Sequence, residues 1–267
     1  MSTPLADVSL GLAGALDRAA IRELAVAAEA AGLHALWLND TPDGEALAGL
    51  AAAAEVTDHL VLATGVIPFD RRPASVIAER VRDLALPQER LVLGVGSGAA
   101  RRPLALVSPQ LDELQRSVEA PVLLGALGPK MRELAATRAS GALLSWLPPA
   151  VAAETAAELR ETATDADSPR PRAVLYARGI VESAAAEALA EESARYASYP
   201  SYAANFDRLG ISAEDTTISG TTAETLRARV GDYRSGVDEL VFRAITAEGS
   251  TPAYRRIIDA LAAAVAR

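Results

Sequence analysis

The chain has 267 residues, half of them hydrophobic, so it can bury a substantial core, and an intrinsically disordered protein is excluded. Its net charge of −9 argues against general nucleic-acid binding, because contacts with phosphates need a basic surface. It contains no cysteine, which excludes disulfides, thiolate catalysis, zinc–thiolate sites and iron–sulfur clusters. No apolar run approaches the roughly 18 residues of a membrane span and no signal peptide is recognisable, so we expect a cytoplasmic protein without membrane contacts.

Short apolar runs alternate with longer periodic stretches, which is typical of buried parallel strands that alternate with helices. The first helix has clear limits, since Asp17 can cap its N-terminus and Gly32 can end it. The predicted strands cover residues 8–13, 35–39, 60–66, 91–96, 121–126, 142–147, 172–181 and 237–244. The predicted helices cover residues 17–31, 44–56, 74–86, 109–118, 129–140, 149–161, 184–198 and 252–266.

This alternation predicts the fold class: an α/β protein with the (β/α)8 TIM-barrel architecture, forming a single domain over residues 1–267. An open, doubly wound sheet is the alternative, but such sheets more often have about five to seven strands. Residues 199–236 do not fit the alternation, and we predict that they form a helical insertion before the last strand.

In such a barrel the functional residues lie at the carboxyl ends of the strands and in the loops that follow. His34 and His59 both precede a predicted strand, so we interpret them as surface or capping residues at the opposite end. Without cysteine and without a well-placed histidine, a metal site, a Ser–His–Asp triad and a histidine general base are not expected.

Glycine and positive charge gather in the loops after the third, fourth and fifth predicted strands, at residues 65–73, 94–103 and 125–131. Glycine lets a backbone approach a ligand, and a helix N-terminus beside a cation binds anions. We therefore expect an anionic ligand here, with ordinary turns and solvated arginines as the alternative for any one loop. The charged residues of the three loops are Asp70, Arg71, Arg72, Arg101, Arg102 and Lys130, a net charge of +4.

Two common nucleotide motifs are missing. The stretch GVGSG at residues 94–98 does not match GxGxxG, and no GxxxxGK[ST] motif occurs. A Rossmann-type NAD site and a P-loop ATPase are therefore not expected.

Several segments resemble the luciferase-like flavin and deazaflavin oxidoreductases, a family of (β/α)8 barrels. The most specific segment is ALGPKM at residues 126–131. Other similar segments are AAEAAGLHALW at 27–37, ATGV at 63–66, RLVLGVGSG at 90–98, YPSY at 199–202 and GVDEL at 236–240. Together they resemble the subgroup of probable F420-dependent oxidoreductases.

The resemblance implies a flavin-like ring bound at the top of the barrel. It implies a cis peptide bond between Gly65 and Val66 that supports one face of the ring, with Gly96 and Ser97 lining the ring or its ribityl chain. It also implies that the loop after the fifth strand binds the cofactor phosphate, through Gly125, Ala126, Leu127, Gly128, Lys130 and Met131. The arginines of the preceding loops could then meet the anionic tail of the coenzyme.

The chain departs from the family at one catalytic position. Several relatives carry a catalytic histidine after an aspartate at the end of the second strand, whereas Thr41 follows Asp40 here. Asp40 remains the candidate catalytic acid or base, with hydrogen bonding to the ring or to backbone as the alternative. Trp146 could form a wall of the substrate site, or it could pack within the barrel.

The leading hypothesis is an F420-dependent oxidoreductase that transfers a hydride between the deazaflavin coenzyme and a small organic substrate. The first alternative is an FMN-dependent monooxygenase that receives reduced flavin from a partner reductase. The second alternative is a non-catalytic flavin-binding protein. Because relatives often dimerise, a homodimer is also expected, and the alanine-rich helix within residues 47–56 is a candidate contact.

Overall fold

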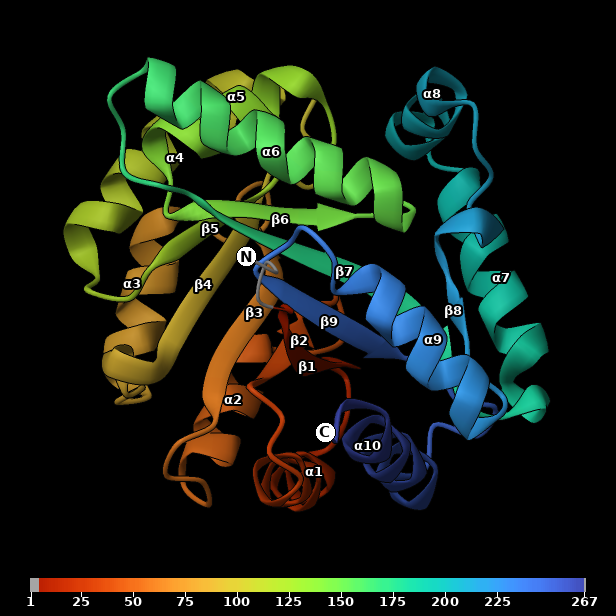
Figure 1. Cartoon of the computed structure of the whole chain (residues 1–267). Helices are drawn as coiled ribbons and strands as arrows, with labels where there is room; N and C mark the ends of the chain where they lie inside the picture. The colour runs from red at the N-terminus through yellow and green to blue at the C-terminus, as the bar shows by residue number, and fades with distance from the viewer. Residues whose placement is uncertain (1–4, 267) are drawn as a thin grey trace.

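The computed structural model describes residues 5–266, and these residues form a closed barrel of parallel strands surrounded by helices (Figure 1). The strands follow the order β6-β5-β4-β3-β2-β1-β9-β7, and β6 pairs with β7 to close the ring. The predicted (β/α)8 barrel is confirmed, because the closing pair excludes an open doubly wound sheet. The barrel strands are β1 (Asp7–Ala13), β2 (Ala35–Asn39), β3 (Val61–Pro68), β4 (Leu91–Gly96), β5 (Val122–Gly125), β6 (Gly141–Ser145), β7 (Arg172–Ile180) and β9 (Glu239–Ala244).

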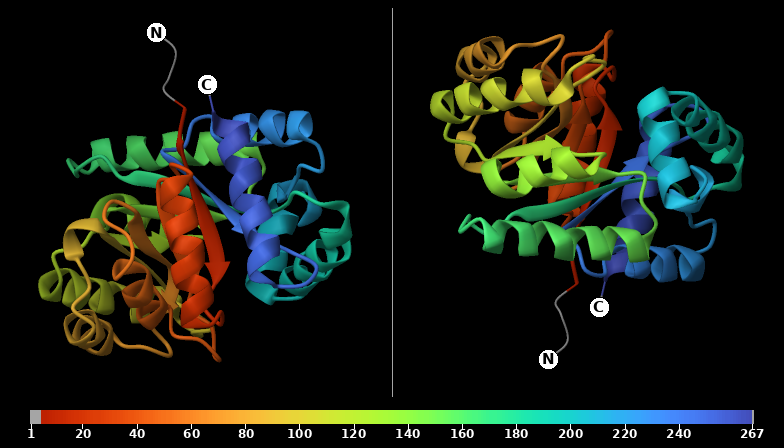
Figure 2. Two further views of the ribbon diagram at one scale, coloured as in Figure 1. Left: turned by 90° about the horizontal axis from the view of Figure 1, so that it is seen from below. Right: turned by 90° about the horizontal axis from the view of Figure 1, so that it is seen from above.

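Helices cover the outside of the barrel (Figure 2). Their buried residues pack on the outward-facing side chains of the strands in one continuous apolar core. The helices of this layer are α1 (Arg18–Ala30), α2 (Ala46–Ala54), α3 (Ala74–Asp83), α4 (Pro103–Ser117), α5 (Pro129–Arg138), α6 (Pro149–Asp165), α9 (Ala223–Tyr233) and α10 (Thr251–Val265).

The predicted limits of α1 are borne out by its caps. The Asp17 side chain accepts a hydrogen bond from the N–H of Ala20 at 2.8 Å, which satisfies one free donor of the first turn. Gly32 follows the helix with φ of +71°, a conformation that glycine adopts without steric cost.

The fourth helix begins earlier than predicted, at Pro103 rather than at residue 109. Pro103 stands at the start of the helix, where its missing N–H costs nothing, and Pro109 is accommodated inside it. Val107, Leu111 and Leu114 share one face of α4 and are buried, so tertiary packing outweighs the helix-breaking tendency of Pro109.

The predicted helix at 184–198 is present, but it does not join the outer layer of the barrel. The corresponding helix, α7 (Ala186–Ala197), buries only Leu189 and Ser193 and packs against β7 and α8 (Pro200–Leu209). The place between α6 and α10 belongs to α9, which buries three large side chains. Residues 199–236 thus contain α8, the two-residue strand β8 (Ile218–Ser219), which pairs with β7 outside the closed ring, and α9.

The inside of the barrel is filled with side chains. A separate apolar cluster there combines small residues with Trp37 and Tyr176, whose rings meet edge to face at 6.5 Å. At the amino-terminal end of the strands, the buried carboxylate of Glu239 accepts from Ser9, Trp37 and Arg172. The amino-terminal end is therefore plugged, and any ligand site of the barrel lies at the carboxyl end. Among residues 5–266, no helix combines the length and apolarity that crossing a membrane requires.

Candidate active site at the carboxyl end of the barrel

The bond between Gly65 and Val66, at the carboxyl end of β3, is a cis peptide bond, as the resemblance implies. It coincides with a shift of the β3–β4 register between Thr64 and Ile67. A Cβ atom on Gly96 would lie 3.0 Å from Val66 Cγ2, and a Cβ on Gly125 would lie 3.2 Å from Val66 Cγ1. The half-buried Val66 thus packs directly on two bare backbone segments. These three residues bring the ends of β3, β4 and β5 into one surface at the mouth of the barrel.

A polar network beside this surface joins residues of β2, β3, β7 and β9. The Asn39 amide donates to the carbonyl oxygen of Gly65. Asn39 Oδ1 accepts from the Tyr176 hydroxyl at 2.8 Å and from Arg243 Nε at 3.1 Å. Burial raises the pKa of Tyr176 to about 12, so this hydroxyl stays protonated and acts as a donor. Sequence reasoning missed Asn39, Tyr176 and Arg243, although each lies in a predicted strand.

The predicted phosphate loop leads into the N-terminus of α5. Gly128 occupies the cap position without any capping side chain, and Pro129 begins the helix. A Cβ atom on Gly128 would meet no protein atom within 4 Å, so the space beside this backbone is open. Lys130 is exposed, whereas Met131 packs partly on the apolar core and the N–H of Ala126 donates to Leu143. The loop therefore offers backbone at Gly128 and a cation at Lys130.

Arg132, one turn into α5, is the residue at this end of the helix that sequence reasoning missed. Its Nε and Nη2 atoms are buried and have no hydrogen-bond partner among the described residues. Burial and the nearby Arg208 both lower the pKa of the Arg132 guanidinium, so each disfavours its charged form. Buried donors almost always have an acceptor. An anion at the start of α5 would supply that acceptor, and these donors therefore fit a phosphate group.

Helix α8 reaches the same loop. Arg208 Nη2 donates to the carbonyl of Leu127 at 3.5 Å and also to the side chain of Asn205. Asn205 is buried, and its Nδ2 has no partner in the described part of the chain. Two arginines and an unsatisfied amide donor thus gather where α8 approaches the start of α5.

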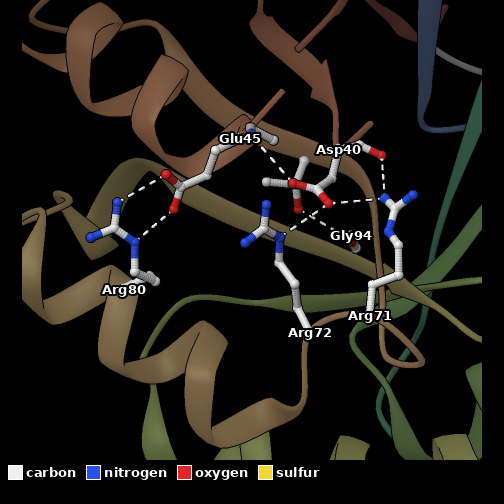
Figure 3. A network of polar contacts seen from close by, with 8 residues as sticks. Asp40, Glu45, Arg71, Arg72, Arg80 and Gly94 are labelled. Carbon is white, nitrogen blue, oxygen red and sulfur yellow. Dashed lines mark hydrogen bonds and ion pairs between the residues drawn. The ribbon is translucent and has the colours of Figure 1, made fainter. Parts of the chain in front are cut away.

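Asp40 lies in a clamp between the loops that follow β2 and β3 (Figure 3). Its Oδ2 accepts from Arg71 Nη2 at 3.0 Å and from Arg72 Nε at 3.2 Å, and its Oδ1 accepts from the N–H of Ala46 at 3.3 Å. The carboxylate is only 1% exposed. Both oxygens are thus engaged by protein donors, Oδ2 by two arginine side chains and Oδ1 by backbone, and the catalytic role of Asp40 stays a prediction.

The clamp also limits how far the arginines in the loop after β3 can attract an anionic ligand. Arg71 donates in addition to the backbone carbonyl of Asp40 at 2.8 Å, and the neighbouring Glu45 forms a two-pronged pair with Arg80 (Figure 3). Part of the positive charge that the sequence places in this loop is therefore compensated within the protein.

The loop after β4 is held by Asp70. Its Oδ2 accepts from the N–H of Ala99 at 2.8 Å, and Gly98, with φ of +59°, lies so close that any Cβ atom would collide with the Asp70 carboxylate. Ser97 is half-buried, and within the described part of the chain its hydroxyl has one hydrogen bond, to the carbonyl of Gly98 at 3.4 Å. Ser97 therefore remains available at the end of β4.

Trp146, the candidate substrate wall, lies inside a cluster rather than on an open surface. Trp146 is only 1% exposed. The centroid of its ring lies 4.8 Å from that of Tyr196 and 6.0 Å from that of Phe206. The Arg178 guanidinium lies 4.1 Å from the ring centroid. In this arrangement the ring forms part of the packing that attaches α7 and α8 to the barrel.

The histidines lie at the end of the barrel away from the mouth. His34 Nδ1 is 3.7 Å from Asp7, which begins β1, and the N–H of His59 donates to Glu29. Within residues 5–266, no group of three or more metal-ligating side chains comes together. Two hollows have volumes of about 250 and 200 Å³. The first lies between α9 and α10, and the second lies between the loops that follow β1 and β2, at the starts of α1 and α2.

The model of the luciferase-like monooxygenase family matches residues 5–108 and 100–267. Among solved structures, an F420-dependent secondary alcohol dehydrogenase is similar, with a TM-score of 0.73, 14% identity and coverage of 97% of this chain and 99% of that one. A coenzyme F420-dependent tetrahydromethanopterin reductase from Methanopyrus kandleri has a TM-score of 0.69 and 13% identity, with coverage of 97% and 98%.

A third similar structure is the oxygenating constituent of 3,6-diketocamphane monooxygenase from Pseudomonas putida, in complex with FMN. It has a TM-score of 0.67 and 12% identity, with coverage of 95% of this chain and 97% of that one. No protein of curated function matches the sequence. The structural similarities support the barrel fold, and the family model covers nearly all of the chain. The chain belongs to the luciferase-like monooxygenase family of flavin- and F420-dependent oxidoreductases.

Proposed function

We propose that this protein is an F420-dependent oxidoreductase that transfers a hydride between the deazaflavin coenzyme and an organic substrate. The observation that carries the proposal is Arg132, whose buried donor atoms lack an acceptor beside the uncapped N-terminus of α5. A phosphate there would accept from the guanidinium and from backbone N–H groups of the first turn. Similar structures with F420-dependent activities support the choice of this coenzyme.

The chain's own residues have two tasks in this proposal. Val66, Gly96 and Gly125 provide the surface against which the ring would lie. Arg132 and Arg208 hold the phosphate, so that the ring is positioned by its tail. When bound, the coenzyme supplies the hydride chemistry, and the protein supplies orientation and charge.

The network around Asn39 lies beside this surface. The amide of Asn39 donates to the carbonyl of Gly65, and its Oδ1 accepts from the Tyr176 hydroxyl at 2.8 Å. These bonds fix the backbone that carries Val66, so the surface offered to the ring is preorganised.

An FMN-dependent monooxygenase is the second candidate, and it is supported by the similar structure that contains FMN. FMN carries a single phosphate, which the same donors around Arg132 would accept. This route requires reduced flavin from a partner reductase. Incorporation of an oxygen atom from O2 into the organic product separates the two candidates, because only the monooxygenase transfers oxygen to its substrate, whereas free reduced FMN also consumes oxygen on its own.

Titration of the purified protein with F420 and with FMN, followed by the change in cofactor fluorescence, tests the proposal. We expect micromolar binding of at least one of them. Arg132→Gln should weaken that binding by about 1.5–3 kcal/mol, because a charge-assisted contact is lost. Arg255→Gln, on the exposed side of α10, is the matched control and should bind as the unmodified protein does. Absence of micromolar binding of both cofactors would falsify the proposal.

A further inference from the structure

Two arginines stand side by side at the mouth of the barrel. Arg178 of β7 pairs in register with Arg243 of β9. The same register pairs Tyr176 with Val241, and both of these line the barrel interior. Because side chains alternate along a strand, Arg178 and Arg243 face inward as well, one layer nearer the mouth.

Arg178 is buried among compensating groups, although its Nε has no hydrogen-bond partner among the described residues. It is 5% exposed, donates to Ser145 Oγ at 2.5 Å and lies 3.7 Å from Glu192. The rings of Trp146 and Tyr196 flank its guanidinium, with centroids at 4.1 and 4.6 Å. The charge of Arg178 is therefore balanced by the nearby carboxylate of Glu192 and by two aromatic ring faces, and these contacts attach α7 to the barrel.

Arg243 has no such compensation. It is half-buried; its Nε donates to Asn39, and its Nη1 donates to the carbonyl of Ala244. No carboxylate lies within 4.0 Å of it among residues 5–266, and Nη2 has no hydrogen-bond partner there. Glu192, the acidic group beside Arg178, is shared with Arg195. Of the two inward-facing arginines, Arg243 therefore carries a positive charge without a counter-charge, and its hydrogen bond to Asn39 fixes its position.

The order of strands places this charge across the mouth from the proposed cofactor surface. Val66, Gly96 and Gly125 come from β3, β4 and β5, whereas β7 and β9 form the opposite side of the closed ring. The proposed phosphate site at Arg132 begins α5, directly after β5. A ring that reaches from α5 over Val66 would therefore have Arg243 on the side left for the substrate.

We propose that Arg243 binds an anionic group of the organic substrate, of the carboxylate class. A carboxylate can accept from the free Nη2 and would supply the counter-charge that the protein lacks at this point. Asn39 acts as a positioning residue, since it fixes Nε and leaves the outer edge of the guanidinium open. This assignment rests on the proposed function, because it identifies as the substrate side the space across from the cofactor surface.

The test compares acids with their uncharged amides. Binding of benzoate and benzamide, and of hexanoate and hexanamide, is measured by calorimetry at low ionic strength with the protein saturated in whichever cofactor binds, and also without cofactor. We expect each acid to bind better than its amide. Arg243→Gln should reduce the preference by about tenfold or more, Arg243→Lys should retain part of it, and Arg255→Gln should leave it unchanged.

Cofactor titration separates this proposal from the previous one. Arg243→Gln should bind F420 or FMN within about twofold of the unmodified protein, whereas Arg132→Gln should not. A preference for acids that depends on Arg243 supports the proposal even if no cofactor binds. Equal binding of acid and amide in both pairs overturns it, and so does loss of cofactor affinity in Arg243→Gln with the acid preference intact. If Arg243→Gln does not fold, the proposal is tested by the acid–amide comparison in the unmodified protein and in Arg243→Lys.

Discussion

Trp37 Nε1 donates to Glu239 Oε1 at 2.6 Å inside the barrel, and the same carboxylate pairs with Arg172 at 2.9 Å. Glu239 is 1% exposed, so its removal would leave an indole N–H, a serine hydroxyl and an arginine without their acceptor. We expect Glu239→Leu to lower the free energy of unfolding by about 3 kcal/mol, near the lower end for buried pairs because Arg172 is one-third exposed. Urea unfolding measures this, and Glu239→Gln should lose less. Equal stability of the leucine variant would show that the pair is dispensable.

Asp40→Asn tests the role of the clamp between the loops after β2 and β3. The variant keeps an acceptor for the N–H of Ala46 but removes the charge that Arg71 and Arg72 share. We expect a loss of about 1–3 kcal/mol in the free energy of unfolding, because charge-assisted hydrogen bonds are weakened. Glu45→Gln, beside the clamp, is the comparison. If stability is unchanged and turnover alone is lost, Asp40 acts in catalysis instead.

Tyr176 makes stability depend on alkaline pH. Burial raises its pKa in the folded protein to about 12, whereas the unfolded chain ionises near 10. The unfolded state therefore releases the proton first, and stability is complete below pH 10 and falls as pH rises towards 12. We expect a loss on the order of 2 kcal/mol from this residue. Tyr176→Phe should flatten the fall in urea unfolding between pH 9 and 12, and Tyr254→Phe is the control.

Gly128 and Lys130 separate the backbone and side-chain contributions of the phosphate loop. Gly128→Ala should leave stability within about 0.5 kcal/mol, because the added methyl group meets no protein atom. It should nevertheless weaken cofactor binding, since the methyl group occupies the approach to the start of α5. Lys130→Ala should cost about 1 kcal/mol or less, because the exposed ammonium is screened by water. Thermal unfolding and cofactor titration give the two quantities, and unchanged affinity in Gly128→Ala would place the phosphate elsewhere.

The strands and the position of the mouth could be predicted because apolar runs bounded by glycine and proline are local signals. The predicted limits of β2 and β4, at 35–39 and 91–96, coincide with the observed strands. The outer helices were less secure. The start of α4 was predicted at Pro109, whereas the helix begins six residues earlier. The sequence also did not show that α9, rather than α7, packs on the barrel, because only tertiary packing decides which of two amphipathic helices does so.

The polar residues of the site were harder to find. Arg132 lies in a helix that looks ordinary in sequence, and the nearby Arg208 comes from α8, a distant segment. Arg243 lies in a predicted strand that also carries Asp238 and Glu239, and only the closed barrel shows that neither of them is its counter-charge. Asp40 was found because it follows a strand, but its partners are fixed by how the next loop folds back.

The hydrogen bond from Arg208 to Leu127 links the excursion after β7 to the loop that begins α5. A ligand that fills the start of α5 therefore also restrains α8, and α8 in turn rests on the aromatic cluster around Trp146. Loading of the protein should thus be visible far from the ring itself: amide exchange in α8 slows, and proteolytic nicking near residue 210 becomes rarer.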